Sequence, residues 1–384
     1  MPGSEILIYG YGAVCLSMII FNIFYNIILR GKAPLTERKT ERVKTALLEK
    51  YGETSSSACG NKLLAAPGTA GFFKYSRLKP ERSEDLLILS DALSDILNSE
   101  HREAGERFIQ ELQKDFLHLA KEYLKKDSMQ TAYFAAFLQE YCRWSEYKEE
   151  LLEVLLNYAS KRNLYCRINA LDALYAMGNA GYVVRAVVMQ DKSEAPLHTR
   201  VLTEGLLSFS GDQNELTTKL LERFDEFSDR TRLAVLNYIR SQSGDYQEFM
   251  YRIMTDERKE RELRFSAERY LGRYPWEPAR DALIAFVKDK EALHWEYAAL
   301  AAWALKNYEG EDVLSALKSA LYSPNWYVRY NAAESLESKG FSYAELIDVM
   351  AGKDRYAREI MAYRFDLQRL MENERISEKG REEA

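Results

Sequence analysis

Polar and apolar positions recur with a fixed period between residues 163 and 350. A basic residue marks each period, and successive markers lie 33, 32, 32 and 65 residues apart, where 65 is two periods. The markers are Arg167, Arg200, Arg232, Arg264 and Arg329, with Glu296 at the skipped place. A small or β-branched residue follows each marker by three positions, and a large apolar residue follows it by seven. Helical spacing repeated at such a period predicts stacked helical hairpins.

The segments between the marked helices are also apolar at helical spacing, so each period is expected to hold a second helix. These partner helices are predicted over 182–189, 216–224, 246–254, 278–287, 313–321 and 343–350. One hairpin cannot bury such an apolar face alone, and stacked neighbours are therefore expected to share a continuous core. An earlier repeat without the arginine is predicted over 128–158, because Phe134, Phe137 and Tyr141 keep the same offsets.

The rest of the chain divides by composition. Residues 81–127 are predicted to form the first helices of the array, and the repeats themselves occupy 128–352. A charged helix over 353–376 would cap the last repeat, as a stacked array needs for solubility, and 377–384 would be a solvated tail. Residues 52–80 contain many Gly, Ser and Ala residues, which predicts a flexible linker.

The N-terminal region predicts a membrane anchor. Residues 6–29 carry no formal charge over 24 positions, which is long enough for one transmembrane helix. A cleaved signal peptide would require a basic leading segment and a small-residue cleavage site, and the sequence has neither. The flank 1–5 carries only Glu5, whereas the predicted juxtamembrane helix at 30–51 is rich in Lys and Arg. The positive flank predicts a single-pass protein of the cell membrane, with its N-terminus outside and its repeats cytoplasmic.

Two asparagines interrupt the predicted span. Asn22 and Asn26 lie four residues apart and would share one face of the helix. They could hydrogen-bond a neighbouring transmembrane helix. Alternatively, both lie close enough to the cytosolic end to meet lipid headgroups, and the sequence leaves these two interpretations open.

Two segments resemble a known family. NWYVRYNAAESLESKG (325–340) and LYCRINALDALYAMGN (164–179) resemble the second helix of a HEAT repeat, in the form found in phycobilin lyases. The resemblance covers roughly residues 126–352 and implies an all-α fold, a right-handed α-solenoid of HEAT-like hairpins behind the transmembrane helix. It also implies that the arginine at this position pairs with an acidic residue in the turn before it or in the next repeat. The candidate acids are Asp191, Asp229, Asp256 and Asp289. We call the five arginine markers the arginine ladder, and we expect its role to be structural. The alternative is that these arginines form a row on the surface that binds a ligand.

Composition and motifs restrict the function. A net charge of −6 argues against nucleic acid as the main ligand, because phosphate binding needs a basic face. The four cysteines are far apart and the four histidines isolated, so we predict no disulfide framework, metal site or cofactor. The sequence contains no P-loop, H-E-x-x-H or nucleophile-elbow motif, and we predict no catalytic residues.

Aromatic residues gather around the last two markers and indicate a binding surface. They are Trp295, Tyr297, Trp326, Tyr327 and Tyr330. Consecutive residues on a helix point in different directions, so burial in the core cannot explain all five. Trp and Tyr often carry binding energy at protein interfaces. The alternative is that the two tryptophans only fill gaps between repeats.

These observations predict a membrane-tethered scaffold or adaptor that docks a partner protein at the cytoplasmic face. The partner could be the cytosolic part of a membrane enzyme. The alternative is a HEAT-like enzyme or nucleic-acid-binding protein that uses its concave face, resembling bilin lyases or repeat-built DNA glycosylases. A basic groove with a deep polar pocket would favour the alternative, and a broad aromatic face would favour the adaptor.

Overall fold

The computed structural model describes residues 17–18, 36–52, 68–142, 148–289 and 291–382, and these residues are helical with no β-strand among them. The chain forms two compact units, which we describe separately. Unit 1 comprises residues 1–193 and 208–216, and unit 2 comprises 194–207 and 217–384. The all-helical fold agrees with the expectation of a helical repeat protein.

The N-terminal part of unit 1 packs around Phe108. It contains a helix over 36–51, α3 (Thr69–Ser76), α4 (Ser83–Leu97) and α5 (Arg102–Leu124). The Phe108 ring lies 4.7 Å from Phe72 of α3 and 5.4 Å from Tyr51, between ring centroids. The predicted linker over 52–80 therefore contains a packed helix, because Phe72 gives that segment an apolar side chain that is completely buried.

The remaining helices of unit 1 stack in alternation. They are α6 (Ser128–Tyr141), α7 (Lys148–Ala159), α8 (Leu164–Met177) and α9 (Ala180–Asp191). Helix α6 packs on α8, and α7 packs on both α5 and α9. Side chains of Asp127, Asn163 and Asn179 cap the N-termini of α6, α8 and α9. Gly178 ends α8 at φ 68°, a left-handed conformation that favours glycine.

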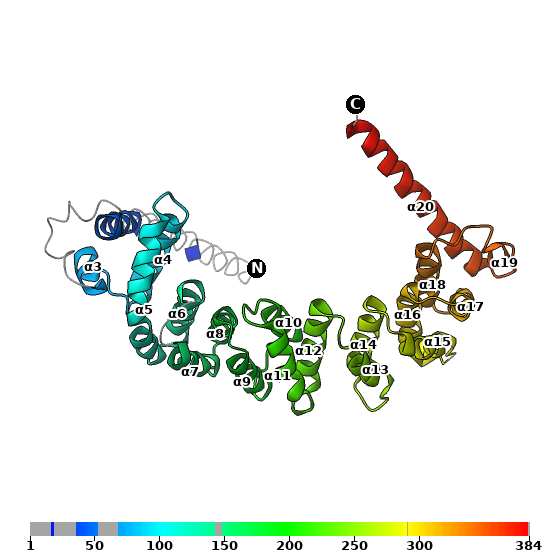
Figure 1. Cartoon of the computed structure of the whole chain (residues 1–384), viewed down its shortest axis with the longest axis horizontal. Helices are drawn as coiled ribbons and strands as arrows, with labels where there is room; N and C mark the ends of the chain where they lie inside the picture. The colour runs from blue at the N-terminus through cyan, green and yellow to red at the C-terminus, as the bar shows by residue number, and fades with distance from the viewer. Residues whose placement is uncertain (1–16, 19–35, 53–67, 143–147, 290, 383–384) are drawn as a thin grey trace, which may run out of the picture. The chain divides into compact units, whose positions relative to one another are not determined.

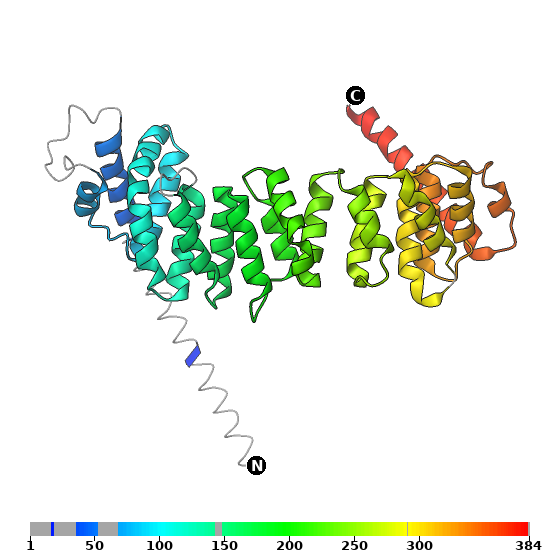
Figure 2. The ribbon, with the colours of Figure 1, turned by 60° about the horizontal axis from the view of Figure 1, so that its bottom comes forward.

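Unit 2 repeats the same arrangement, which Figures 1 and 2 show as helices standing side by side within the unit. Before its C-terminal end, unit 2 contains α10 (Thr199–Leu207), α12 (Asp229–Gln242), α13 (Gln247–Thr255), α14 (Arg261–Arg273), α15 (Arg280–Lys288), α16 (Trp295–Ala304), α17 (Glu311–Ala320) and α18 (Trp326–Ser338). Helix α11 (Gln213–Glu222) contributes residues to both units. Each marked helix packs on the next one, from α10 through α12, α14 and α16 to α18.

Hydrogen bonds between successive marked helices hold unit 2 together at the period of the sequence. Asn331 Nδ2 donates to Ala299 O at 2.7 Å, and Ser335 Oγ donates to Ala302 O at 2.7 Å. The Tyr308 hydroxyl links two elements, since it donates to Leu271 O and accepts from the backbone N–H of Trp276. These bonds satisfy buried polar groups, so the repeat spacing is fixed by polar as well as apolar contacts.

The C-terminal end differs in two places from the prediction. The last partner helix is only α19 (Ile347–Met350), a single turn. The final helix α20 (Arg355–Glu382) continues through most of the predicted tail, and it packs on α18 and α19. Its charged residues are spaced for pairs one turn apart, such as Arg355 with Glu359 at 2.6 Å, which support a solvated helix.

Within the described ranges, no helix is both long and apolar enough to cross a membrane. The predicted span over 6–29, with Asn22 and Asn26, lies outside the described residues except for Ser17 and Met18. The anchor and its two asparagines therefore stay predictions.

Candidate binding surfaces

An aromatic pair joins the beginnings of two adjacent helices in unit 2. Trp295 is the first residue of α16, and Tyr327 is the second residue of α18. Their rings are stacked, with centroids 5.4 Å apart and planes inclined by 23°. Because α16 packs directly on α18, one period of the sequence brings these two residues together.

A second stacked pair continues the same surface along α18. Trp326 and Tyr330 lie one helical turn apart, with ring centroids 4.9 Å apart and planes inclined by 26°. Trp326 also contacts Tyr327 edge to face at 5.1 Å. Trp295, Trp326, Tyr327 and Tyr330 therefore form one connected set, which we call the aromatic cluster. Trp326 is 50% exposed and Tyr327 is 56% exposed, so large aromatic surface remains in contact with water.

The aromatic cluster is fixed in place by α20. Arg364 Nη1 donates to the Tyr330 hydroxyl at 3.1 Å, and its guanidinium lies over the Tyr330 ring at 5.4 Å. Arg364 Nε in turn donates to Glu337 at 2.5 Å, and both charged side chains are mostly shielded from water. The final helix thus orders one end of the cluster through a charge-assisted hydrogen bond.

Tyr297 is separate from the cluster, although the sequence groups it with the other four. Its ring packs against Phe265 at 4.7 Å and Phe286 at 5.7 Å. The Arg264 guanidinium lies 4.6 Å from its ring centre. Burial raises the pKa of Tyr297 above its usual value, while the Arg264 charge opposes that shift. Tyr297 is therefore a packing residue between repeats.

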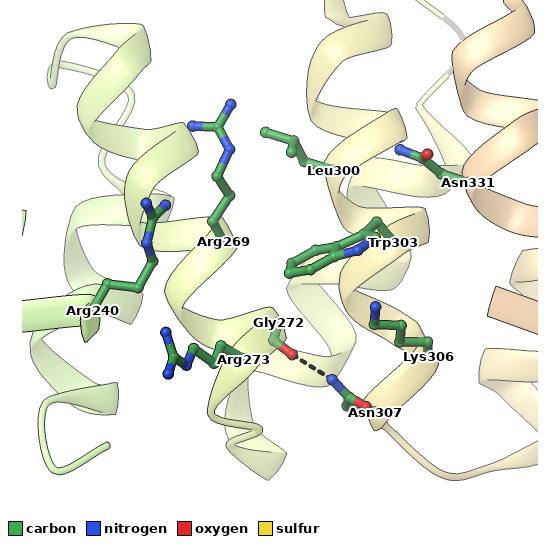
Figure 3. A pocket seen from close by; sticks show the side chains of 9 residues that line it. All are labelled: Arg240, Arg269, Gly272, Arg273, Leu300, Trp303, Lys306, Asn307 and Asn331. Carbon is green, nitrogen blue, oxygen red and sulfur yellow. Dashed lines mark hydrogen bonds between the residues drawn. The ribbon is translucent and has the colours of Figure 1, made fainter. Parts of the chain in front are cut away.

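A basic groove of about 580 Å³ is the second candidate surface (Figure 3). Four cations line it, namely Arg240 of α12, Arg269 and Arg273 of α14, and Lys306 of the short helix η4 (Leu305–Asn307). Leu300 and Trp303 of α16 form its apolar wall. Within the part of the chain that the structure describes, none of the four cations lies within 4 Å of a carboxylate oxygen. The groove is a concentration of positive charge on a chain whose net charge is negative.

The three arginines influence one another. Burial lowers the pKa of Arg240 below its usual value, and the nearby charges of Arg269 and Arg273 lower it further. Arg269 and Arg273 lie one turn apart on α14 and share the face towards Arg240 (Figure 3). Like charges held together without an opposite charge are unfavourable, so an anion in the groove would be stabilised.

Trp303 forms the centre of the groove because the neighbouring helix carries a glycine. A Cβ atom at Gly272 would lie 2.5 Å from Trp303 Cζ3 and 2.9 Å from Ala304 Cβ. The missing side chain lets the indole lie against α14, with one part buried and the rest facing the groove. Lys306 holds its ammonium 4.6 Å from the centre of the indole. Asn307 Nδ2 donates to Gly272 O at 2.6 Å and fixes this end of the groove.

The arginine ladder contacts backbone carbonyl oxygens as well as an expected acid. Arg232 donates to Phe224 O and Asp225 O, and it also pairs with Asp229 at 2.9 Å. Arg264 donates to Met254 O, and Arg329 donates to Ser323 O and Pro324 O. These acceptors are carbonyl oxygens at or just beyond the end of the preceding helix, where a cation also meets the negative end of the helix dipole.

Two of the other expected acids pair with residues outside the ladder. Asp256 pairs with Arg258 and Asp289 with His294. Arg167 is buried and donates to Gln190 Oε1 and Ser193 Oγ, whereas Arg200 is exposed and pairs with Glu204 on its own helix. The ladder is thus uneven, and of the candidate turn acids Asp229 pairs with a ladder arginine, Arg232. At Arg264 and Arg329, carbonyl oxygens near the end of the preceding helix accept the hydrogen bonds of the guanidinium.

The basic groove was not found from the sequence. Its cations occupy different offsets in successive periods, so no single register position carries the signal. Two arginines four residues apart on α14, without an acid one turn away on the same face, are the local pattern that could have indicated it.

No protein-family model matches this chain, and no curated protein matches it either.

Proposed function

We propose that the protein is a membrane-tethered adaptor whose HEAT-like right-handed α-solenoid docks a partner protein on the aromatic cluster. The observation that carries this proposal is the exposure of Trp326 and Tyr327 within a set of stacked rings. The repeating contacts between marked helices support the solenoid, because each helix buries its apolar face against its neighbours.

The cluster has the physical properties of an interaction hot spot. Its rings are held by mutual stacking and by Arg364, so little side-chain entropy would be lost when a partner binds. Covering Trp326 and Tyr327 would remove apolar surface from water while their polar tips could still reach hydrogen-bond partners. A protein surface with its own apolar pocket or aromatic residues is the ligand that such a cluster suits best.

The tether is proposed from the uncharged run over 6–29 and from the basic flank after it. It would hold the repeats at the cytoplasmic face, close to the cytosolic parts of other membrane proteins. A reporter fused after Ala384 should then behave as cytosolic, and a reporter that works only outside the membrane would overturn this orientation.

Docking is tested by capture of partners with the full-length chain from detergent-solubilised membranes. Trp326→Ala and Tyr327→Ala should each lose a specific partner while the variant stays folded and its free energy of unfolding falls by about 1 kcal/mol or less. Tyr133→Ala is the matched control, because Tyr133 is a 44% exposed aromatic residue that belongs to unit 1, whereas the cluster belongs to unit 2. Equal capture by all three variants would contradict docking on the aromatic cluster.

A further inference from the structure

The basic groove has a chemistry that the proposed docking on the aromatic cluster does not use. Arg240, Arg269, Arg273 and Lys306 line it without an ion-pair partner among the described residues. The nearest acid in sequence is Glu268, which is completely buried within α14 and does not line the groove. Four cations therefore face a space whose lining, as far as the structure describes the chain, contains no carboxylate.

The spread of the cations favours an extended ligand over a compact one. The lining residues come from α12, α14, α16, η4 and α18, and consecutive marked helices are in contact. The four cations lie on α12, α14 and η4, which directly follows α16, so they span two helix contacts. Helix axes in contact lie about 8–10 Å apart, and two such steps extend over roughly 16–20 Å. An extended polypeptide covers that distance with about five or six residues. A single phosphate group would instead require donors that converge on one point.

The apolar wall of the basic groove sets a second requirement for the ligand. Leu300 and Trp303 lie between the arginines of α14 and Lys306 (Figure 3). Trp303 is only partly buried, and Lys306 covers part of the indole at 4.6 Å from its centre. A ligand that uses the whole groove must carry carboxylates at both sides of an apolar or aromatic side chain. Arginine suits this task because its planar guanidinium binds a carboxylate in a bidentate manner.

We propose that the basic groove binds an extended acidic segment of a partner protein, with an apolar side chain seated against Trp303 and Leu300. This inference rests on the proposed role as a protein-binding scaffold and adds the chemistry of the partner. Charge complementarity supports it, since the groove is positive on a chain of net charge −6, and that remaining charge would repel a long nucleic acid.

The test uses the purified full-length chain and a labelled ten-residue probe, made of glutamates with one leucine and one phenylalanine at the centre. Fluorescence anisotropy should detect saturable binding that weakens as salt rises. A probe with glutamine in place of glutamate should bind at least tenfold more weakly. Arg269→Glu and Lys306→Gln should each weaken the acidic probe by tenfold or more. Arg230→Glu is the charge-matched control on an exposed arginine of α12, and it should change affinity less than twofold.

The outcomes separate this inference from the proposed function. Circular dichroism of each variant establishes that it is folded, and Lys306→Gln provides a second, milder change if Arg269→Glu unfolds the unit. Equal affinity of the acidic probe for the parent, Arg269→Glu and Lys306→Gln would overturn the groove as its site. Tighter binding of a ten-nucleotide oligothymidine or of ATP, lost in the same variants, would overturn the acidic segment in favour of a phosphate ligand. If the captured partner is lost in Trp326→Ala but retained in Arg269→Glu, the groove inference fails while the proposed docking stands.

Discussion

The guanidinium of Arg264 lies 4.6 Å from the centre of the Tyr297 ring, while its Nε donates to Met254 O. One side chain thereby connects the end of α13 to the first turns of α16. Tyr297 completes this connection by packing on Phe265 of α14. The contact explains why two neighbouring aromatic residues of α16, Trp295 and Tyr297, have different roles, one in a surface cluster and one between repeats.

This difference predicts opposite effects of alanine substitution. Tyr297→Ala should lower the free energy of unfolding by about 2–4 kcal/mol, because it removes an aromatic ring packed between helices. Trp326→Ala should cost about 1 kcal/mol or less, since half of its side chain is already exposed. Urea unfolding followed by circular dichroism measures both. A larger loss for Trp326→Ala than for Tyr297→Ala would mean that the aromatic cluster serves the stacking of repeats.

The arginine ladder gives a second prediction. Arg232→Ala should lower stability by about 1–3 kcal/mol, because Phe224 O and Asp225 O would lose their donor near the end of the preceding helix. Arg200→Ala is the control at the equivalent sequence position. Its side chain is exposed and pairs with Glu204 on the same helix, so its effect should stay within about 0.5 kcal/mol. Amide hydrogen exchange should locate the loss for Arg232→Ala at the start of α12, and equal effects of the two substitutions would refute this account.

The sequence predicts the helical periods well, because apolar spacing is imposed by the core that each helix must share. Ala332 and Leu336, at the third and seventh positions after Arg329, are both completely buried. Trp303 holds the equivalent seventh position after Glu296 but lies partly in the groove. The pattern therefore predicts the all-helical fold and the burial of these positions. It does not predict that Trp303 is partly exposed in the groove.

The surfaces were less accessible to sequence reasoning. Trp295 stacks on Tyr327, which lies 32 positions further along the chain. The period predicts an aromatic surface here, but it does not predict which rings stack on each other. The carbonyl partners of Arg232 and Arg264 depend on where the preceding helix ends, and helix ends are weakly encoded. The basic groove needs Arg240, Arg269 and Lys306 to line one space from three elements at unequal offsets, which only the packing of the helices determines.

Gly272 gives a third prediction, on the shape of the basic groove. Gly272→Ala would place its Cβ 2.5 Å from Trp303, so the indole must move and stability should fall by about 1–3 kcal/mol. Gly181→Ala is the control within α9, where the nearest atom to an added Cβ is Asn179 Oδ1 at 3.4 Å. There the change should stabilise the protein by about 0.5–1 kcal/mol, because alanine is the better helix former. A Gly272→Ala variant as stable as the parent would show that the groove adapts without cost.

The buried carboxyl group of Glu268 predicts a dependence of stability on pH. The side chain is completely buried, and neither of its oxygens has a hydrogen-bond partner among the described residues. Burial raises its pKa well above the usual value of 4.5, although the charges of Arg269 and Arg264 oppose the shift. The unfolded chain therefore releases this proton at a lower pH than the folded protein. Between these two pKa values the folded state holds more protons, so this group reduces stability as the pH rises.

The contribution of Glu268 should appear as a slope of about 1.4 kcal/mol per pH unit over that interval, starting near the unfolded pKa and ending once the folded protein also ionises. Glu268→Gln removes the titrating group while keeping its size, so it should flatten this part of the curve and stabilise the protein at neutral pH. Glu262→Gln, on an exposed position of the same helix, is the control and should leave the slope unchanged. Urea unfolding at a series of pH values from 4 to 8 gives both curves. If Glu268→Gln and the parent show parallel curves, the ionisation of Glu268 does not destabilise the fold between pH 4 and 8, and this account of its buried carboxyl group is wrong.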